Sequence, residues 1–265
     1  MIKIFNELKA FNGLLQAEYL KTRKTWAFWL SVLGGLLIPA IMFLVIRSQP
    51  GIIQNPMHPT PWLLFLKYNW QSVATFLLPL FLVLLTSLVV QTEHRANAFK
   101  KMLTLPNSRA TYYWAKLLII IYYTILTHIV FVFSIIVFGL ILGSIVPETQ
   151  FLDKPIPLEM MSIQIVKSIL ASLGIIAIQF LISLQFKNFI KPIGFGFATT
   201  LAGSIMLLGW EYVDYWPWSL PAKVSPGIMS GGSSEIFTQH EWISIGYFLI
   251  ISVLGTIYFS RKNIK

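Results

Sequence analysis

The sequence predicts an all-α integral membrane protein with six transmembrane helices. Of its 265 residues, 56% are hydrophobic and 11% are charged, whereas soluble domains carry about 25% charged residues. The apolar residues gather in blocks of about 20, the length that a helix needs to cross the hydrocarbon layer. Since lipid leaves only helices or a closed barrel as spanning structures, blocks of this length favour helices over the alternating ten-residue strands of a barrel.

The expected elements follow in order along one transmembrane domain over residues 1–265. Residues 1–26 read as an amphipathic helix in the membrane interface, with packing on a partner protein as the alternative. The third span is longer than one crossing needs, so we expect it to tilt or to project from the bilayer. The six spans are expected at about 27–46, 69–90, 112–146, 163–186, 193–210 and 242–259.

The distribution of charge predicts the orientation in the membrane. Six spans place both termini on one side, and fifteen of the 20 Lys and Arg lie in the segments expected on that side. The positive-inside rule therefore places both termini and the 91–116 connection in the cytoplasm of a multi-pass plasma membrane protein. This asymmetry accounts for most of the net charge of +10, so a nucleic-acid partner is not required.

The polar run 91–116 between the second and third spans is expected to form a short amphipathic helix. Its apolar residues recur at helical spacing, and Pro106 ends the helix because the residue before a proline avoids helical geometry. Such a helix at the membrane face suits docking to a protein outside the bilayer, and a solvated loop that reverses the chain is the alternative. The apolar positions are Thr92, Ala96, Phe99 and Leu103, with His94, Asn97 and Lys101 opposite.

Motifs for catalysis and metal binding are missing from the sequence. There is no G-x-x-x-x-G-K-[ST], no H-E-x-x-H and no G-x-S-x-G, the signatures of a phosphate cradle, a zinc protease and a serine hydrolase. The chain has no cysteine, and its four histidines are scattered, which is a poor pattern for a metal site. We therefore expect no catalytic residue, no metal and no cofactor on this chain.

Two intramembrane features carry more than one interpretation. His128, in the middle of the third span, either belongs to a substrate or proton path or is a neutral imidazole bonded to a neighbouring helix. Small residues on one face of the fifth span let helix backbones approach closely, as a subunit interface or as packing within the chain. These residues are Gly194, Ala198 and Ala202, and Gly34 in the first span is a further position for close contact.

Aromatic residues crowd the loop before the last span. Tyr215, Trp216 and Trp218 lie close to Pro217 and Pro221. They are expected either to form a structured cap over the external end of a path or to form an ordinary aromatic belt at the headgroups. The cap is favoured because the loop holds more aromatic rings than a belt requires.

Three stretches together resemble the membrane subunit of a type-2 ATP-binding-cassette (ABC) exporter, in the group that includes lantibiotic-immunity permeases. They are AEYLKTRKTWAFWL at 17–30, E-H-R-x(4)-K-K-M-L-T-L-P-N-S-R at 93–109 followed by Lys116, and YWPWSLP at 215–221. The six-span layout covers nearly the whole chain. None of the three is as specific as a P-loop, and their order and spacing carry the resemblance.

The resemblance implies a partner ATPase and a second permease. The connection between spans two and three would be the coupling helix that docks on the ATPase, through Glu93, Arg95, Phe99, Lys100 and Leu103. The first and fifth spans would face a second permease chain, identical or related, and the segment before the sixth span would cover the external end. ATP and Mg²⁺ would then be bound by two separate ATPase subunits.

The implied function is export of an amphipathic substrate, such as an antimicrobial peptide in self-immunity or resistance, driven by ATP hydrolysis on the partner. Membrane lipid is a further expected partner. A stand-alone six-helix secondary transporter or channel is the alternative, and it would need an intramembrane charged relay for which His128 is the available residue. An intramembrane enzyme would need a converging nucleophile and base, which the sequence does not supply.

Overall fold

The computed structural model describes residues 2–53, 60–95, 108–224 and 237–261, and over these ranges the chain is helical, without a strand. Four short elements connect the helices: η1 (Pro50–Ile52), the π-helical η2 (Val73–Leu77), η3 (Pro147–Thr149) and η4 (Val213–Tyr215). The α-helices are α1 (Ile2–Thr22), α2 (Trp26–Ser48), α3 (Pro61–Ser72), α4 (Leu78–Arg95), α6 (Arg109–Ile145), α7 (Leu158–Gln185), α8 (Ile190–Met206), α9 (Leu220–Lys223) and α10 (Gln239–Arg261).

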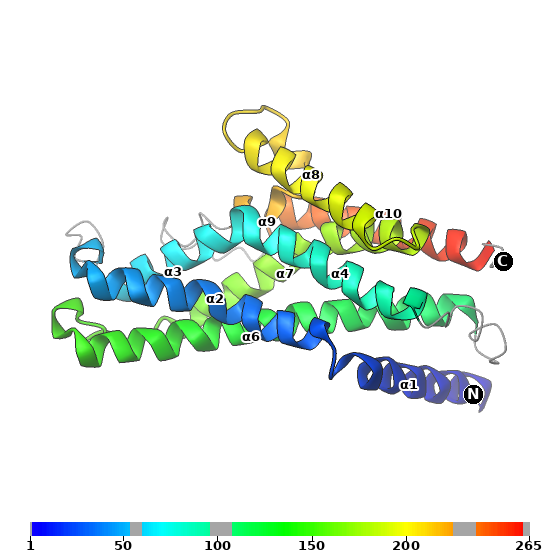
Figure 1. Ribbon diagram of the computed structural model, residues 1–265, viewed down its shortest axis with the longest axis horizontal. Coiled ribbons are helices and arrows are strands. Elements are labelled where there is room, and N and C mark those ends of the chain that lie inside the picture. The colour runs from blue at the N-terminus through cyan, green and yellow to red at the C-terminus, as the bar shows by residue number, and fades with distance from the viewer. Residues whose placement is uncertain (1, 54–59, 96–107, 225–236, 262–265) are drawn as a thin grey trace.

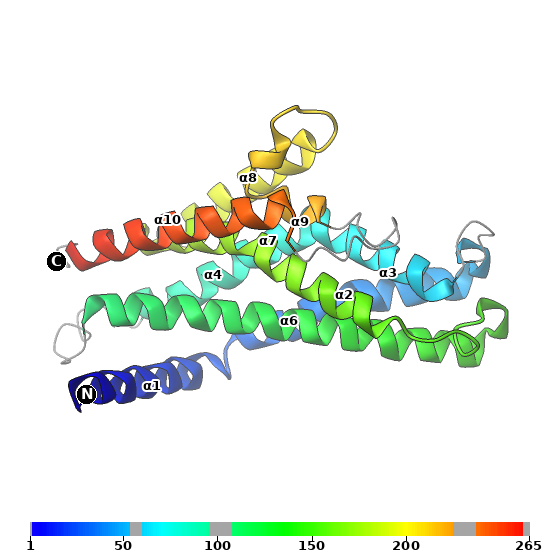
Figure 2. The same ribbon diagram turned by 180° about the vertical axis from the view of Figure 1, so that it is seen from behind.

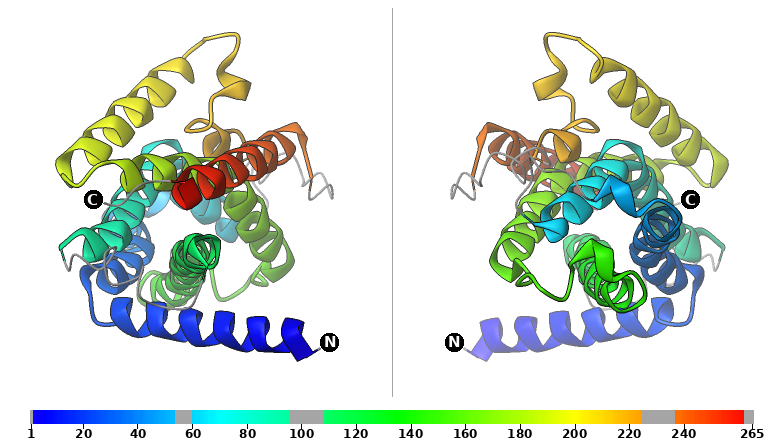
Figure 3. Two further views of the ribbon diagram at one scale, coloured as in Figure 1. Left: turned by 90° about the vertical axis from the view of Figure 1, so that its right-hand side faces the viewer. Right: turned by 90° about the vertical axis from the view of Figure 1, so that its left-hand side faces the viewer.

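The long helices form an elongated bundle with both termini at one end (Figures 1 and 2). Helix α1 instead crosses the direction of the bundle, as the end-on views in Figure 3 show. An amphipathic helix that crosses the direction of the spanning helices is the arrangement expected of an interfacial segment. At the other end, α2, α3 and α6 project well beyond α8 and α10 (Figure 1).

Five helical stretches of the described chain are long and apolar enough to cross a membrane: Trp26–Ser48, Pro61–Glu93, Arg109–Ile145, Leu158–Gln185 and Gln239–Arg261. They coincide with the first, second, third, fourth and sixth predicted spans. The third has 37 residues, about 55 Å of helix, which is consistent with the projection that its length predicted.

The fifth predicted span, 193–210, is not confirmed as a crossing. Helix α8 begins at Ile190 and has 17 residues, somewhat fewer than the about 20 that span a bilayer. It ends at Met206 because the chain turns there, and Gly209 adopts a φ of 154° that other residues rarely tolerate. The described structure therefore supports five crossings by length and composition, with α8 as a shorter, oblique helix (Figure 3).

A π turn joins α3 to α4 without interrupting the second span. Pro79 has no N–H to donate to the carbonyl of Thr75, so the α-helical bond between them is lost. The turn widens over Val73–Leu77, and the hydroxyl of Ser204 on α8 donates to the Thr75 carbonyl at 3.2 Å. The sequence therefore builds a local irregularity, of a kind frequent at functional sites, beside α8.

The projecting end has a hydrophobic core of its own. Trp62 is fully buried, packs edge-on against Phe151 and donates its indole N–H to the Phe151 carbonyl at 3.0 Å. Gly139 of α6 makes room for it, since a Cβ there would lie 2.5 Å from the Trp62 ring. This packing ties the start of α3 to the turn between α6 and α7, so the projection is a built part of the fold.

Candidate functional site

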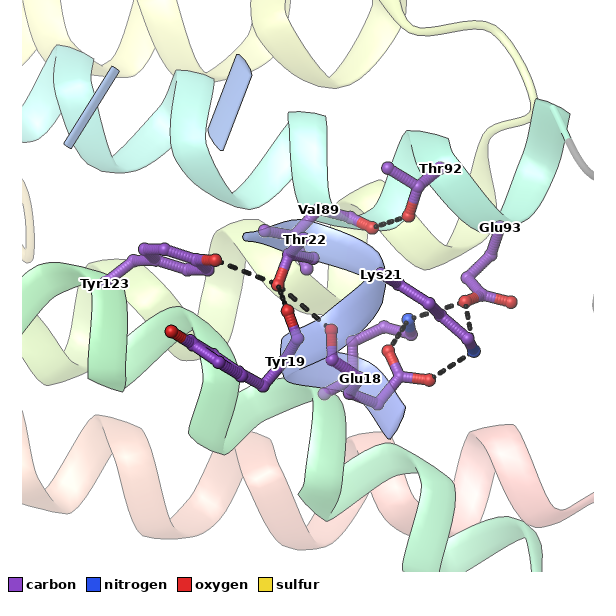
Figure 4. A network of polar contacts seen from close by, with 9 residues as sticks. Glu18, Tyr19, Lys21, Thr22, Val89, Thr92, Glu93 and Tyr123 are labelled. Atoms are coloured by element: carbon purple, nitrogen blue, oxygen red, sulfur yellow. Dashed lines mark hydrogen bonds and ion pairs between the residues drawn. The ribbon is translucent and has the colours of Figure 1, made fainter. Parts of the chain in front are cut away.

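Four charged side chains from three helices meet at the end of the bundle that holds the termini (Figure 4). Lys116 of α6 donates to Glu18 Oε2 of α1 at 2.7 Å and to Glu93 Oε1 of α4 at 3.1 Å. Lys21 closes the ring through Glu18 Oε1 at 2.6 Å and Glu93 Oε1 at 3.1 Å. We call Glu18, Lys21, Glu93 and Lys116 the ion ring. Its charges alternate and sum to zero.

The ion ring is buried between α1, α4 and α6 except at Lys21. The side chains of Glu18, Glu93 and Lys116 are 2%, 2% and 3% exposed, and Lys21 is 45% exposed. Leu14, Glu18 and Thr22 follow one another at four-residue spacing on the buried face of α1, so the helix places the carboxylate where an apolar residue would normally pack. A charge in such a position requires charged partners.

The two ring members on α1 have shifted pKa values. Burial alone would raise the pKa of Glu18, but the charge and hydrogen bond of Lys116, together with Lys21, hold it below its usual range. For Lys21, burial alone would lower the pKa, while its bonds to Glu18 and Glu93 raise it above the usual value. Both groups therefore carry their charges throughout the neutral pH range.

A second contact fastens the end of α1 to α6. The hydroxyl of Tyr123 donates to Thr22 Oγ1 at 3.0 Å, and Thr22 in turn donates to the Glu18 carbonyl at 3.0 Å (Figure 4). Tyr123 and Thr22 are both buried. Helix α1 is thus held by a hydrogen bond as well as by ion pairs.

The position of the ring along the chain indicates what it can do. Glu93 lies near the last described residue before 96–107, and Lys116 lies two turns into the helix that follows this segment. A displacement of either flank would therefore pull on the carboxylate or the ammonium and, through Glu18, on α1. The ring therefore connects both flanks of 96–107 to α1. Among the described residues, no group of three His, Asp or Glu could hold a metal.

Of the residues predicted to dock on an ATPase, the structure describes Glu93 and Arg95 and leaves out the others. Glu93 is paired inside the chain in the ion ring and is 2% exposed, and its docking role stays a prediction. Arg95 is the last residue of α4. The segment predicted as the coupling helix, with Phe99, Lys100 and Leu103, lies outside the described residues, and both its helical form and its docking role stay predictions.

The residues predicted at the permease–permease interface differ in exposure. Gly194 and Ala198 of α8 are exposed, and a Cβ on Gly194 would meet open space. Ala202 is half-buried, and the close contact within the chain is made by Gly196 against Val83 of α4. Gly34 faces Phe81 of α4, 3.1 Å from its Cβ position. The small face of α8 is therefore available to a partner, whereas Gly34 packs within the chain.

The three aromatic residues before the last span differ in exposure. Trp218 is 4% exposed and Trp216 donates its indole N–H to the Thr199 carbonyl of α8 at 3.2 Å. The Trp216 ring and the Cβ of Trp218 pack over Gly203. Tyr215 is 53% exposed. The two tryptophans thus hold the segment after α8 against that helix in this conformation, and Tyr215 is the ring presented outward.

His128 lies inside the bundle with both ring nitrogens in hydrogen bonds. Nδ1 lies 2.8 Å from the Thr124 carbonyl, and Nε2 lies 2.9 Å from Ser168 Oγ on α7. The residue is 4% exposed. This geometry matches the alternative in which a neutral imidazole links two helices.

Three ring members were missed as site residues at the sequence level: Glu18, Lys21 and Lys116. A signal was present, because Glu7, Glu18 and Glu93 are the acids on the side of the chain that holds fifteen basic residues. A carboxylate at a buried position of an amphipathic helix predicts a charged partner. The sequence does not say which of the many nearby lysines supplies it.

A smaller set of charges lies at the start of α10. Lys167 of α7 and Glu241 form an ion pair at 3.3 Å, with exposures of 6% and 0%, and Thr238 donates to Glu241 from its N–H at 2.8 Å and from its hydroxyl. Nearby, Asp214 pairs with Lys223 at 2.8 Å and with His240 at 3.3 Å. The hydrogen bond from Lys223, with a further one from His240, lowers the pKa of Asp214.

Two comparisons relate the chain to known proteins. Residues 14–203, which include α2 to α7, most of α8 and the whole ion ring, match the sequence profile of the ABC-2 family transporter protein. The chain is 27% identical, over 199 residues, to the bacitracin transport permease protein BCRB of Bacillus licheniformis, covering 75% of this chain and 90% of that protein. The helices of spanning length and this match over most of the chain agree: the chain belongs to the ABC-2 transporter family.

Proposed function

We propose that this chain is the permease subunit of an ABC exporter and that the ion ring couples it to a separate ATPase subunit. The observation that carries the proposal is the buried contact of Lys116 with both Glu18 and Glu93. These three residues lie on the interfacial helix and on the two helices that flank 96–107. A movement imposed on that segment by ATP binding would reach α1 and α6 together.

In this proposal two ATPase subunits bind ATP and Mg²⁺, and two permease chains form the pathway. The exposed Gly194 and Ala198 on α8 suit contact with a second permease. Helix α8 would cross the membrane with a tilt as the fifth of six spans, completed by the turn after Met206. Both termini and the ion ring would then face the cytoplasm.

The proposed cargo is an amphipathic compound, with antimicrobial peptides as the first class to test. The support is the similarity to a permease named for bacitracin transport. Export driven by an ATPase also accounts for a chain that carries neither a P-loop nor, among its described residues, a cluster of groups fit for a metal.

The proposal is tested by co-purification with the ABC ATPase expressed from the same cells. We expect the wild-type chain to retain the ATPase in detergent, and Phe99→Ala and Leu103→Asp to lose most of it, because truncation of apolar interface anchors costs about 2 kcal/mol or more. Phe133→Ala is the matched control, since Phe133 is an apolar residue 66% exposed on the side of α6.

Glu18→Gln separates docking from coupling. We expect this variant to retain the ATPase, because the docking segment is unchanged, and to lose most of the resistance to bacitracin or to related peptides that the wild-type chain gives its host. A wild-type chain that never binds an ATPase would contradict the proposal and favour the stand-alone transporter.

A further inference from the structure

A groove opens between α2 and α4 at the end of the bundle that holds the ion ring. Its cavity measures about 630 Å³. Lys24 lines it just before α2, Trp26 and Trp29 line it from α2, Leu88 and Gln91 line it from α4, and Phe189 lines it just before α8. Helices α2 and α4 lie against each other here, with the turn before α8 at their side (Figure 3).

A second cavity of about 180 Å³ continues this groove toward the middle of the bundle. It is lined by Leu30, Gly34 and Leu37 of α2 and by Leu80 and Phe81 of α4, and it ends at the π turn, Val73–Leu77. Leu33 lines the first cavity, and Leu30 and Gly34, on either side of it in sequence, line the second. The two cavities therefore follow one seam between the helices.

The length of the seam matches one leaflet of a membrane. Trp26 at its start and Leu37 at its far end lie eleven residues apart on α2, which is about 16 Å of helix. Half of a bilayer's hydrocarbon core is about 15 Å. Polar groups occur at the end near the interface, and the deep part is lined by apolar residues.

The interfacial end of the groove carries positive charge without compensation. Arg23 and Lys24 lie at the start of α2, and Lys187 and Lys191 flank Phe189, and all four side chains are exposed. Within the described part of the chain none of them forms an ion pair, and the two nearby carboxylates, Glu18 and Glu93, are held in the ion ring. This edge is therefore complementary to a negative charge.

We propose that the α2–α4 groove binds one anionic phospholipid of the leaflet next to the ion ring. Lys24 contacts the phosphate, with Gln91 as a hydrogen-bond donor at the same edge. One acyl chain lies along Trp29 and Leu33 and ends against Gly34 and the π turn. This lipid site is separate from the docking segment and does not depend on the proposed export activity.

The charges favour a lipid over a second copy of the chain as the occupant. In a two-fold dimer each copy presents the same patch to its partner, so a copy covering this groove would bring a second set of Lys24, Lys187 and Lys191 toward the first. Like charges at an interface of this kind repel. A phospholipid fits the groove in both respects: its phosphate complements the positive charge, and one acyl chain has the length of the groove.

The test is lipid retention by the full chain, measured by native mass spectrometry after purification from nanodiscs that contain phosphatidylglycerol and phosphatidylcholine in equal amounts. We expect one phosphatidylglycerol to be retained preferentially. Lys24→Gln should weaken this preference about fivefold, since one Lys or Arg near an anionic surface contributes about that factor. Leu37→Trp should lower the retention of both lipids by filling the deep end.

Two matched controls keep the test specific. Arg261→Gln removes a basic residue that is also exposed at this end of the bundle but outside the groove, and Ile41→Trp adds a ring one turn beyond Leu37. Both should retain lipid as the wild type does. If Leu37→Trp fails to fold, the comparison of Lys24→Gln with Arg261→Gln still tests the lipid site.

Three results would overturn the proposal. The first is equal retention of the two lipids by the wild-type chain, and the second is an equal loss in Lys24→Gln and Arg261→Gln. The third is efficient disulfide-linked dimer formation by Leu33→Cys in native membranes, which is readable because the chain has no cysteine and would mean that a second copy covers the groove. Lipid retention requires no ATPase, so failure here leaves the export proposal untouched.

Discussion

The ion ring and the charges at the start of α10 use the same kinds of side chain in different ways. In the ring, Lys116 lies between two buried carboxylates that come from two other helices. At α10, the buried pair Lys167–Glu241 joins two helices, while Asp214 forms its contacts on the surface, 40% exposed. We expect the loss of a buried charge to lower the free energy of unfolding more when that charge connects more helices, whatever the number of charges around it.

The largest effect is expected from removing the centre of the ring. Lys116→Met leaves Glu18 and Glu93 buried side by side without their shared partner, and breaking a buried ion pair in this way costs about 3–5 kcal/mol. The free energy of unfolding in detergent micelles would measure it. Lys154→Met, an exposed lysine in the turn between α6 and α7, should change it by less than about 0.5 kcal/mol.

A double-mutant cycle sharpens this result. The combined variant Glu18→Gln, Lys116→Met no longer leaves Glu18 charged, so it should be less destabilised than the sum of the two single variants, by about 0.5–3 kcal/mol. Simple additivity would mean that the two side chains act independently and that the ring is not a unit.

Breaking the buried ion pair at α10 should lower the free energy of unfolding by less than removing Lys116. Lys167→Met leaves Glu241 buried, but Glu241 keeps the N–H and hydroxyl of Thr238 as donors, so we expect about 3 kcal/mol, at the low end for a broken buried pair. The same unfolding measurement applies, with Glu241→Gln as its counterpart. A loss larger than that of Lys116→Met would reverse the ranking of the two regions.

Acid should also affect the ring, through Glu18. Its pKa is lowered in the folded chain, so its contribution to stability is present above the usual value of 4.5 and is lost as the pH falls through the folded value. The wild-type chain should therefore lose stability below about pH 4.5, and Glu18→Gln should lack this component. Melting temperatures between pH 3.5 and 7 would test it, and identical pH profiles would contradict it.

The smallest effect is expected at the surface. Asp214→Asn removes partly exposed contacts with Lys223 and His240, and such pairs contribute between about 0 and 1 kcal/mol. The difference from the wild type should shrink further in high salt. An effect comparable to that of Lys116→Met would mean that the segment after α8 depends on this aspartate more than its exposure indicates.

Much of the fold could be predicted from the sequence because apolar blocks and caps are local signals. The spans near Trp26, Pro61, Arg109, Leu158 and Gln239 follow from hydropathy, and Ser108, a residue type preferred at helix N-caps, accepts the Thr111 N–H at the start of α6. The end of α8 could not be predicted so well, since the hydrophobic run continues to Trp210 while the backbone turns after Met206.

The ion ring was harder to predict because its contacts are long-range. Glu18 and Lys116 lie 98 residues apart in sequence, and many lysines on the same side could have paired with Glu18. Trp218 is a similar case: its sequence context predicts a cap or a belt, yet the residue is buried and its ring packs edge-on against Phe195 of α8. Composition indicates that buried charged and aromatic residues are important, but the packing of the folded chain determines which residues they contact.

The most direct test of the central claim, that the ring links 96–107 to α1, is hydrogen–deuterium exchange of the permease–ATPase complex with and without ATP and vanadate. We predict that protection changes together in α1, in 96–107 and in residues 109–116 of the wild-type chain. In the combined variant Glu18→Gln, Lys116→Met, the change in 96–107 should persist while that in α1 disappears. A change in α1 that is equally large in this variant would contradict the account.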